Sequence, residues 1–370
     1  MDAAFIPGTE LARRYYAEVV RPLLDRHVPG LAHSAGLIGP GSEVLGFDSP
    51  RSADHNWGPR CQVFVGPGDA GRAPDISAML AVRLPEAFLG WPTRFPDVTA
   101  PGSPVRHWVG IAELGDWLAG RLGFDPRQGV TALDWLSAPA QLLAEVTSGA
   151  LFHDGLSAAA DGGLATARAA LAWYPDDIWR YVLACQWQRI AQEEAFPGRC
   201  AEAGDDLGSA MVTARLVRDL MRLALLMNRR YPPYSKWLGT AFARLPGSAE
   251  LLPALSAALA ATAWPGRERH LCAAYETMAR RHNELALTEP VDVSTRPYYD
   301  RPYLVIDAGR FVAPLRDSIR GDEIRRLPLT GAIDQFVDST DALSQPSLTR
   351  TTISFIHSPS RSYPQARGTE

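Results

Sequence analysis

The spacing of apolar residues divides the chain into a mixed first part and a helical second part. In the first part, Leu11, Tyr15 and Val19 recur at helical spacing, which predicts a helix over residues 10–28. Short runs of β-branched, aromatic and small apolar residues predict three strands, and a capping aspartate before spaced apolar residues predicts a further helix. The strands cover residues 35–38, 61–65 and 105–111, and the further helix covers residues 75–88. This order predicts a small α/β domain over residues 1–150.

From residue 151 the pattern becomes almost wholly helical. The predicted helices cover residues 165–174, 176–195, 205–230, 235–245, 249–262 and 267–287. Because their loops are short, we expect an antiparallel bundle over residues 151–290. Residues 291–344 carry a predicted strand and helix that pack on the core, and the Ser/Thr/Pro/Arg-rich residues 345–370 are expected to be loosely ordered. We therefore predict an α+β fold, with a small mixed-sheet domain followed by an antiparallel helical bundle domain.

Composition narrows the possible partners. A chain of 370 residues is long enough for two domains, and its formal net charge of −4 argues against nucleic acid as a main partner. The four cysteines form no CxxC pair, which favours free thiols in a reducing cytoplasm. No apolar run approaches the ~18 residues of a membrane span, and no signal-peptide pattern opens the chain. We expect a cytoplasmic protein without a membrane partner.

The strongest candidate chemistry lies in residues 41–65, which read GSEVLGFDSPRSADHNWGPRCQVFV. Gly41 and Ser42 predict a tight turn whose backbone N–H groups and hydroxyl can approach a phosphate, because glycine has no Cβ to obstruct it. Asp54 and Asn56 stand two apart at the head of an apolar run. On a strand, such residues point to the same face, so the two side chains are expected to project together.

This stretch resembles the signature of the nucleotidyltransferase superfamily (polymerase-beta-like), a Gly-Ser turn followed by Asp-x-Asp or Asp-x-Glu on a strand. The string DHNWGPR, residues 54–60, resembles more narrowly the Asp-His-Asp-Trp-Gly-Pro-Arg motif of a bacterial subfamily of unknown function. The resemblance continues through YPDDIWRYVLACQW, QEEAFPGR, RYPPYSKWLGTAF and IDQFVDSTD. It implies that Asp54 and residue 56 hold Mg²⁺ or Mn²⁺ against a nucleoside triphosphate, with ATP the expected one, and that the Gly41 and Ser42 turn cradles its phosphates.

The chain departs from that signature at Asn56. An amide oxygen carries no charge, whereas a divalent ion on a triphosphate relies on carboxylate charge, so Asn56 is expected to weaken metal binding and transfer. Natural loss of activity and a deliberate Asp→Asn change made to trap a ligand both remain open. The third carboxylate of the superfamily would lie on the third strand, where Glu113 at the strand end is the nearest candidate metal ligand. A solvated turn residue is the alternative interpretation of Glu113.

Four further charged residues are candidates for phosphate binding or catalysis. Lys236 is the only lysine, and it falls in the predicted first turn of a helix. A cation is unfavourable there unless an anion binds nearby, so one interpretation is that Lys236 contacts a phosphate. The alternative is that this segment is a rigid turn with aromatic side chains in the core. Arg60 is expected to reach a phosphate or to pair with Asp48, and Arg199 to neutralise phosphate charge. Glu193 is a candidate general base for an acceptor hydroxyl, or a salt-bridge partner of a nearby arginine.

Two function classes follow from these residues. The first is a nucleotidyltransferase that transfers a nucleoside monophosphate from the triphosphate to a small-molecule hydroxyl or amine. The second is a catalytically degenerate protein that binds a nucleotide or serves as a scaffold, which Asn56 favours. A transferase acting on tRNA or protein is a third possibility, although a large acceptor calls for a basic cleft that the net charge does not suggest. No P-loop or HExxH string supports an ATPase or a zinc protease.

Overall fold

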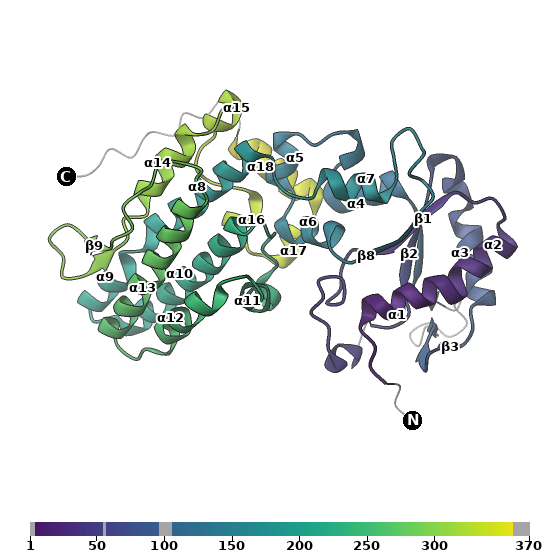
Figure 1. Cartoon of the computed structure of the whole chain (residues 1–370), viewed down its shortest axis with the longest axis horizontal. Helices are drawn as coiled ribbons and strands as arrows, with labels where there is room; N and C mark the ends of the chain where they lie inside the picture. Colours follow the sequence, from purple (N-terminus) through teal and green to yellow (C-terminus); the bar gives the residue numbers. More distant parts are fainter. Residues whose placement is uncertain (1–3, 55–56, 96–105, 358–370) are drawn as a thin grey trace. The chain divides into compact units, whose positions relative to one another are not determined.

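The computed structural model describes residues 4–54, 57–95 and 106–357. The chain forms two compact units. Unit 1 contains Met1–Thr131 and Gln141–Trp173, and unit 2 contains Ala132–Ala140 and Tyr174–Glu370. Each unit carries one of the two predicted architectures, a small mixed sheet with helices in the first and a helical bundle in the second (Figure 1). The α+β prediction is therefore confirmed.

The sheet of unit 1 has four strands in the order β7-β2-β1-β8. Strand β1 pairs antiparallel with both β2 and β8, and β2 pairs parallel with β7. The elements of this unit are α1 (Gly8–Tyr15), η1 (Tyr16–Val20), α2 (Arg21–His27), β1 (His33–Leu37), η2 (Pro50–Asp54), β2 (Cys61–Val65), η3 (Pro67–Arg72), α3 (Ala73–Arg83), β3 (Ala87–Phe88), β4 (Trp91–Pro92), β5 (Arg94–Phe95), β6 (Arg106–His107), β7 (Val109–Glu113), α4 (Leu114–Leu122), η4 (Pro126–Gln128), most of α6 (Ala140–Thr147), β8 (Ala150–Asp154) and α7 (Leu164–Ala170).

Alternation along β2 explains how the sheet is covered. Val63 and Val65 belong to one apolar cluster with Leu11 and Tyr15 of α1, so α1 covers one face of the sheet. Figure 1 shows α1 and α2 as one long helix beside the strands. Phe64 points to the other face, where its ring lies 5.2 Å from that of Trp117 in α4. The sheet is thus buried on both faces, which accounts for the unbroken apolar run of β2.

Some predicted boundaries in unit 1 differ from the structure, and two of the differences change the fold. The helix predicted over residues 75–88 ends at Arg83, because Leu84 precedes a proline and takes an extended conformation. The α/β domain does not stop at residue 150 either. Strand β8 begins there and pairs with β1, so unit 1 continues to Trp173.

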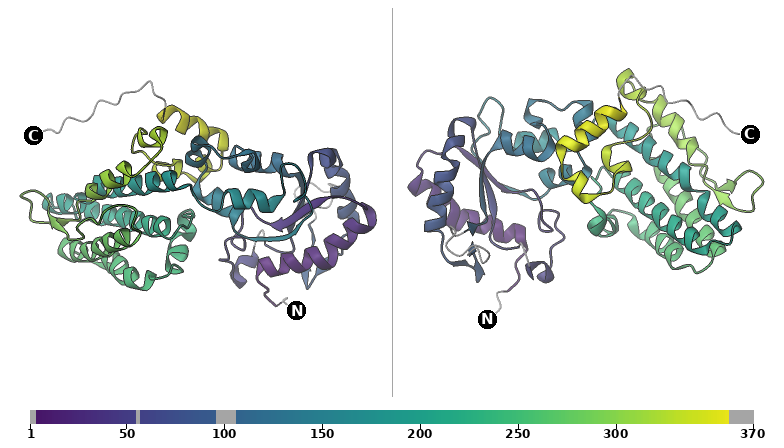
Figure 2. Two further views of the ribbon diagram at one scale, coloured as in Figure 1. Left: turned by 45° about the horizontal axis from the view of Figure 1, so that its top comes forward. Right: turned by 180° about the vertical axis from the view of Figure 1, so that it is seen from behind.

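Unit 2 is a bundle whose main helices pack side by side (Figure 2). Its elements are α5 (Ala132–Ser137), α8 (Asp176–Glu193), α9 (Phe196–Glu202), α10 (Asp206–Met227), α11 (Ser235–Ala243), α12 (Ser248–Ala260), α13 (Trp264–Glu284), β9 (Arg296–Pro297), β10 (Leu304–Val305), α14 (Gly309–Asp317), α15 (Asp322–Arg325), α16 (Ile333–Phe336), α17 (Thr340–Leu343) and α18 (Pro346–Ile356).

Three of the bundle helices meet at Trp187. The Trp187 ring stacks on that of Phe311 at 4.3 Å, and its Nε1 donates a hydrogen bond of 3.2 Å to Nδ1 of His282. Burial lowers the pKa of His282 to about 4, so this ring is a neutral acceptor at the bundle centre. Helices α8, α13 and α14 are joined there, which places residues 291–344 within unit 2 rather than in a part of their own.

The predicted loose order of residues 345–370 is wrong for α18. Ile353 and Thr349 are buried, α18 packs on α5, and Arg350 forms an ion pair with Asp134 of that helix. The sequence prediction missed this because Ser and Thr dominate the stretch and only one apolar side chain is fully covered. Residues 358–370 lie outside the described residues.

Candidate functional site

The Gly41 turn follows β1 and lies beside the start of β2. The backbone N–H of Ile38 donates to the Gln62 side chain at 3.1 Å, and Nη2 of Arg60 donates to the Pro40 carbonyl at 2.6 Å. Gly41 has φ +147°, and a Cβ there would lie 2.2 Å from Nη2 of Arg60. The positive φ therefore favours glycine at this position, and a Cβ there would displace the end of the Arg60 side chain.

Arg60 is held at the turn by a buried carboxylate. Its Nη2 lies 2.6 Å from Oε1 of Glu43, whose side chain is 3% exposed. The predicted alternative pairing with Asp48 is wrong, because Asp48 accepts from the Gly8 N–H at 2.7 Å and from Nε1 of Trp57 at 3.2 Å. Glu43 was not predicted from the sequence, although an acid two residues beyond Gly41, in the loop that leads to Arg60, is a signal for such a pairing.

The structure corrects the expected placement of Asp54. Its backbone closes the short 3₁₀ helix η2, and β2 begins only at Cys61, so Asp54 is not on a strand. The cause is local, because Pro50 starts a helical turn and Gly58 and Pro59 delay the extended run. Asn56, the second predicted catalytic and metal-binding residue, lies outside the described residues, as does His55.

Glu113 lies at the far end of the sheet from Arg60. In the parallel register of β2 and β7, Glu113 is opposite Val65 and Val109 is opposite Cys61. Four residues of strand separate these ends by about 13 Å. The Glu113 carboxylate caps α4 by accepting from the Asp116 N–H at 2.6 Å. Glu113 therefore acts as a helix cap rather than as a ligand shared with the start of β2.

The described part of unit 1 offers no complete metal site. Across residues 4–54, 57–95 and 106–357, no three His, Cys, Asp or Glu side chains come together in a way that would hold a metal ion. Glu43 is the carboxylate nearest to the turn, and it is engaged by Arg60.

In unit 2, Glu193 forms a salt bridge. Both carboxylate oxygens accept from Arg215, at 2.5 and 2.9 Å, which supports the structural alternative over the general base. The adjacent Glu194 is the buried acid: Oε1 accepts from the Ala308 N–H at 2.9 Å, and burial raises its pKa to about 7. Helical periodicity could have identified it, since Glu194 follows buried Ile190 by four residues.

The two remaining predicted cations are exposed and lie against aromatic rings. Nζ of Lys236 is 5.0 Å from the centre of the Trp237 ring, and Cζ of Arg199 is 5.8 Å from that of Phe196. Such contacts stabilise exposed cations by about 0.5–1 kcal/mol. Lys236 and Arg199 belong to unit 2, whereas Gly41, Ser42 and Arg60 belong to unit 1.

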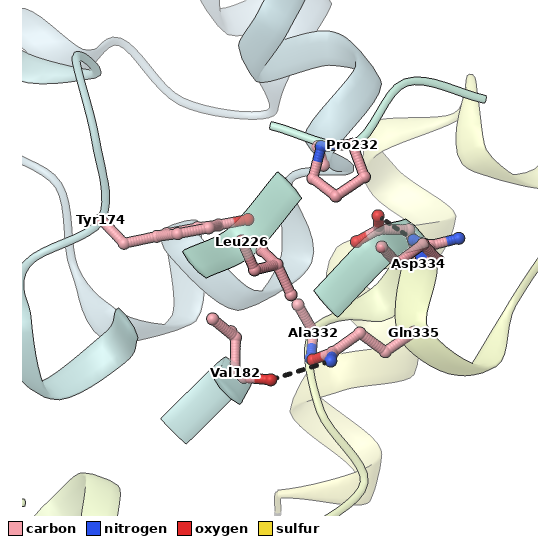
Figure 3. Close-up of a pocket in the computed structure, with 9 residues that line it drawn as sticks. Tyr174, Val182, Leu226, Pro232, Ala332, Asp334 and Gln335 are labelled. Carbon is pink, nitrogen blue, oxygen red and sulfur yellow. Dashed lines mark hydrogen bonds and ion pairs between the residues drawn. The ribbon is translucent and has the colours of Figure 1, made fainter. Parts of the chain in front are cut away.

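Unit 2 also contains a pocket that the sequence did not predict. Its cavity volume is about 10 Å³, and Figure 3 shows the residues that line it. Its walls come from four helices and three loop residues, and all of its lining residues belong to unit 2. They are Ala140, Tyr174, Val182, Arg222, Leu226, Pro232, Ala332, Asp334 and Gln335. Three segments of the sequence resemblance, YPDDIWRYVLACQW, RYPPYSKWLGTAF and IDQFVDSTD, thus meet at one place.

Comparison with known proteins gives one match. A model for a domain of unknown function, DUF4037, matches residues 135–238. That range runs from α5 to the start of α11, and it includes six of the nine residues that line the pocket. Comparisons with curated proteins and with solved structures give no match. Within the described part of the chain, every helix is too short or too polar to cross a membrane.

Proposed function

We propose that this chain is a nucleotidyltransferase-like protein that binds a nucleoside triphosphate, ATP in the first instance, at the Gly41 turn. The transfer of a nucleoside monophosphate to a small-molecule hydroxyl or amine is its reaction, weakened by Asn56. One observation carries the proposal: a glycine turn that a Cβ would fill, with the Arg60 guanidinium lying on it, just before β2.

Each residue at the turn has a role in this proposal. The Gly41 and Ser42 N–H groups and the Ser42 hydroxyl donate to phosphate oxygens, as such turns do elsewhere. Arg60 supplies a planar charged donor, and Glu43 keeps it in place before the ligand binds. Because Arg60 already faces the turn, little side-chain entropy is lost when the phosphate arrives.

The side chains named for metal binding provide only part of the charge that a divalent ion needs. Asp54 and Asn56 would hold Mg²⁺ or Mn²⁺, which neutralises triphosphate charge when bound. Asn56 adds no charge, Glu113 caps a helix and Glu43 is paired with Arg60. These features favour a second candidate function, a catalytically degenerate nucleotide-binding protein.

Calorimetric titration of ATP with Mg²⁺ into variants of Arg60 tests the proposal. Loss of a charge-assisted hydrogen bond costs about 1.5–3 kcal/mol, so Arg60→Gln should weaken ATP binding roughly 10- to 100-fold. The double variant Glu43→Gln with Arg60→Gln leaves no buried charge unpaired and should show the same loss. Arg72→Gln, at an exposed pair with Asp69 in the same unit, is the matched control and should bind as the parent does. Unchanged affinity in both Arg60 variants would contradict the proposal.

A further inference from the structure

A short hairpin in unit 2 covers the C-terminal end of α8. Strands β9 and β10 contribute two residues each, and the Tyr298 N–H donates to the Tyr303 carbonyl at 3.1 Å within the hairpin. In Figure 1 it is the looped segment labelled β9 at one end of the bundle. Tyr303 and Val305 form a small apolar cluster with Ala195, the residue that follows Glu194. A hairpin of this length has little stability of its own, so its position depends on the surface beneath it.

Side chains of two neighbouring helices hold the hairpin. Tyr303 is 3% exposed and lies against α9, where a Cβ added at Gly198 would come within 2.6 Å of its ring. From α13, Glu268 accepts from the Leu304 N–H at 2.6 Å, and Glu276 accepts from the N–H of the residue just before β9 at 3.0 Å. The hairpin is thus held by a few contacts with α9 and α13 rather than by a larger sheet.

Glu194 lies beneath the link between this hairpin and α14. It is 6% exposed, and its Oε1 accepts from the Ala308 N–H at 2.9 Å, while the backbone of Ile306 and Asp307 also faces the carboxylate. Its Oε2 makes no hydrogen bond to the described part of the chain, and neither does the hydroxyl of Tyr275, which is 1% exposed on α13. Buried polar atoms are normally paired, so Oε2 would gain partners from water if the link moved away.

The charged groups around Glu194 do not neutralise it. Asp307 faces it from the link and Arg310 faces it from α14. Arg310 is shared with other carboxylates, since its guanidinium lies 3.5 Å from Asp292 and 3.5 Å from Asp307. On α8 itself, Glu193 is held in its own salt bridge. A proton is therefore the simplest compensation for burying the Glu194 carboxylate.

From this arrangement we propose that residues 296–305 form a lid that is controlled by a proton on Glu194. While the carboxyl is protonated, the lid is closed over the end of α8. When the carboxylate forms, the lid swings away about the turn at Asp307, where φ is +54°, and water reaches the charge. Opening also uncovers Ala195 and the inner face of the Tyr303 ring, so the proton controls access to an apolar surface at this end of the bundle.

The direction of the pH dependence follows from burial. Burial raises the pKa of Glu194 from 4.5 to about 7 in the closed lid, and it outweighs the nearby N–H groups that favour the charge. In the open lid the carboxyl is hydrated and takes its ordinary pKa. The ratio of open to closed lid therefore increases by about tenfold between about pH 6 and about pH 8.

Hydrogen–deuterium exchange of the full chain, followed by mass spectrometry and corrected for the intrinsic exchange rate at each pH, tests the proposal. The reporters are the hydrogen-bonded N–H groups of Tyr298 and Leu304. We expect their protection to be at least tenfold below that of the amides of α10, because the lid opens without unfolding the bundle. We also expect it to fall about tenfold between about pH 6 and about pH 8. Protection equal to that of α10, or protection that does not change with pH, would overturn the proposal.

Two variants show which carboxylate controls the lid. Glu194→Gln keeps a neutral side chain at every pH and should remove the pH dependence of protection at Tyr298 and Leu304. The matched control is Glu202→Gln, which removes an exposed carboxylate that pairs with Arg301 of the hairpin at 3.2 Å. This control should keep the tenfold change. An unaltered pH dependence in Glu194→Gln, or its loss in Glu202→Gln, would show that Glu194 does not control the lid.

Discussion

Buried charge is concentrated at a few residues of this chain, and Glu43 is the clearest case. Its carboxylate is 3% exposed, and Nη2 of Arg60 lies 2.6 Å from it. Breaking a buried pair leaves the surviving charge without compensation. The pair is therefore important for the shape of the turn as well as for its charge.

The change Glu43→Gln should lower the free energy of unfolding by about 3 kcal/mol, because Arg60 loses its counter-charge in a mostly buried site. Urea denaturation measures this loss. Glu10→Gln is the control, since Glu10 pairs with Arg13 at 3.5 Å while half exposed, and it should cost under ~1 kcal/mol. Equal costs for the two variants would contradict the buried pairing.

Glu194 gives the protein a pH-dependent contribution to stability. Burial raises its folded-state pKa from 4.5 to about 7, so the folded state favours the protonated carboxyl. That contribution is fully present below pH 4.5 and is lost as the pH rises through about 7. The side chain remains neutral at all pH values in Glu194→Gln, which keeps an acceptor for the Ala308 N–H.

Relative to that variant, the parent protein should lose about 2 kcal/mol of unfolding free energy between about pH 5.5 and about pH 8. Denaturant titrations of both proteins at a series of pH values measure the difference. Comparison within the pair cancels the opposite trend of the buried histidines, whose pKa values are lowered by burial. Parallel pH profiles for the two proteins would show that Glu194 is not buried as described.

Among single helices and strands, the sequence predicted those whose bounds are set by the local order of apolar and polar residues. The range 61–65 of β2 was predicted correctly because an apolar run between polar loops has few alternatives. Strand β8 was missed, since its residues Ala150–Asp154 are all half-buried and show no alternation, and Asp154 and Gly155 at its end are typical turn residues. Helix α18 was missed for a different reason, because its order comes from packing on α5 rather than from its own composition.

Helix α18 provides the prediction at this scale. Ile353 is fully buried, so Ile353→Ala should destabilise unit 2 by about 3 kcal/mol through lost apolar burial and a residual cavity. Leu348→Ala, on the same helix at a position 46% exposed, should cost under ~1 kcal/mol. Denaturation followed by tryptophan fluorescence compares them. A negligible effect of Ile353→Ala would restore the view that this segment is loosely ordered.

For the whole molecule, the sequence predicted residue types better than their partners. It identified the Gly41 turn and Arg60, but it could not place Glu43, because that pairing depends on how a long loop returns to the sheet. It placed Glu113 at the end of a strand, as observed, but it did not show that the parallel register sets this end away from the start of β2. Arg222 and Asp334, 112 residues apart, meet only through the bundle. Contacts between residues so far apart in the sequence depend on the topology of the fold, and the local periodicity of apolar residues does not reveal that topology.

The central claim, a triphosphate site at the Gly41 turn that is limited by Asn56, is tested most directly by thermal-shift titration. The parent protein and Asn56→Asp are each melted with ATP, with and without Mg²⁺. A ligand at about a hundred times its dissociation constant adds roughly 2.7 kcal/mol, which is readily visible as a rise in melting temperature. The account predicts stabilisation by ATP in both proteins and a larger, magnesium-dependent rise in Asn56→Asp, whose second carboxylate completes the metal site. No shift in either protein, with or without magnesium, would contradict it.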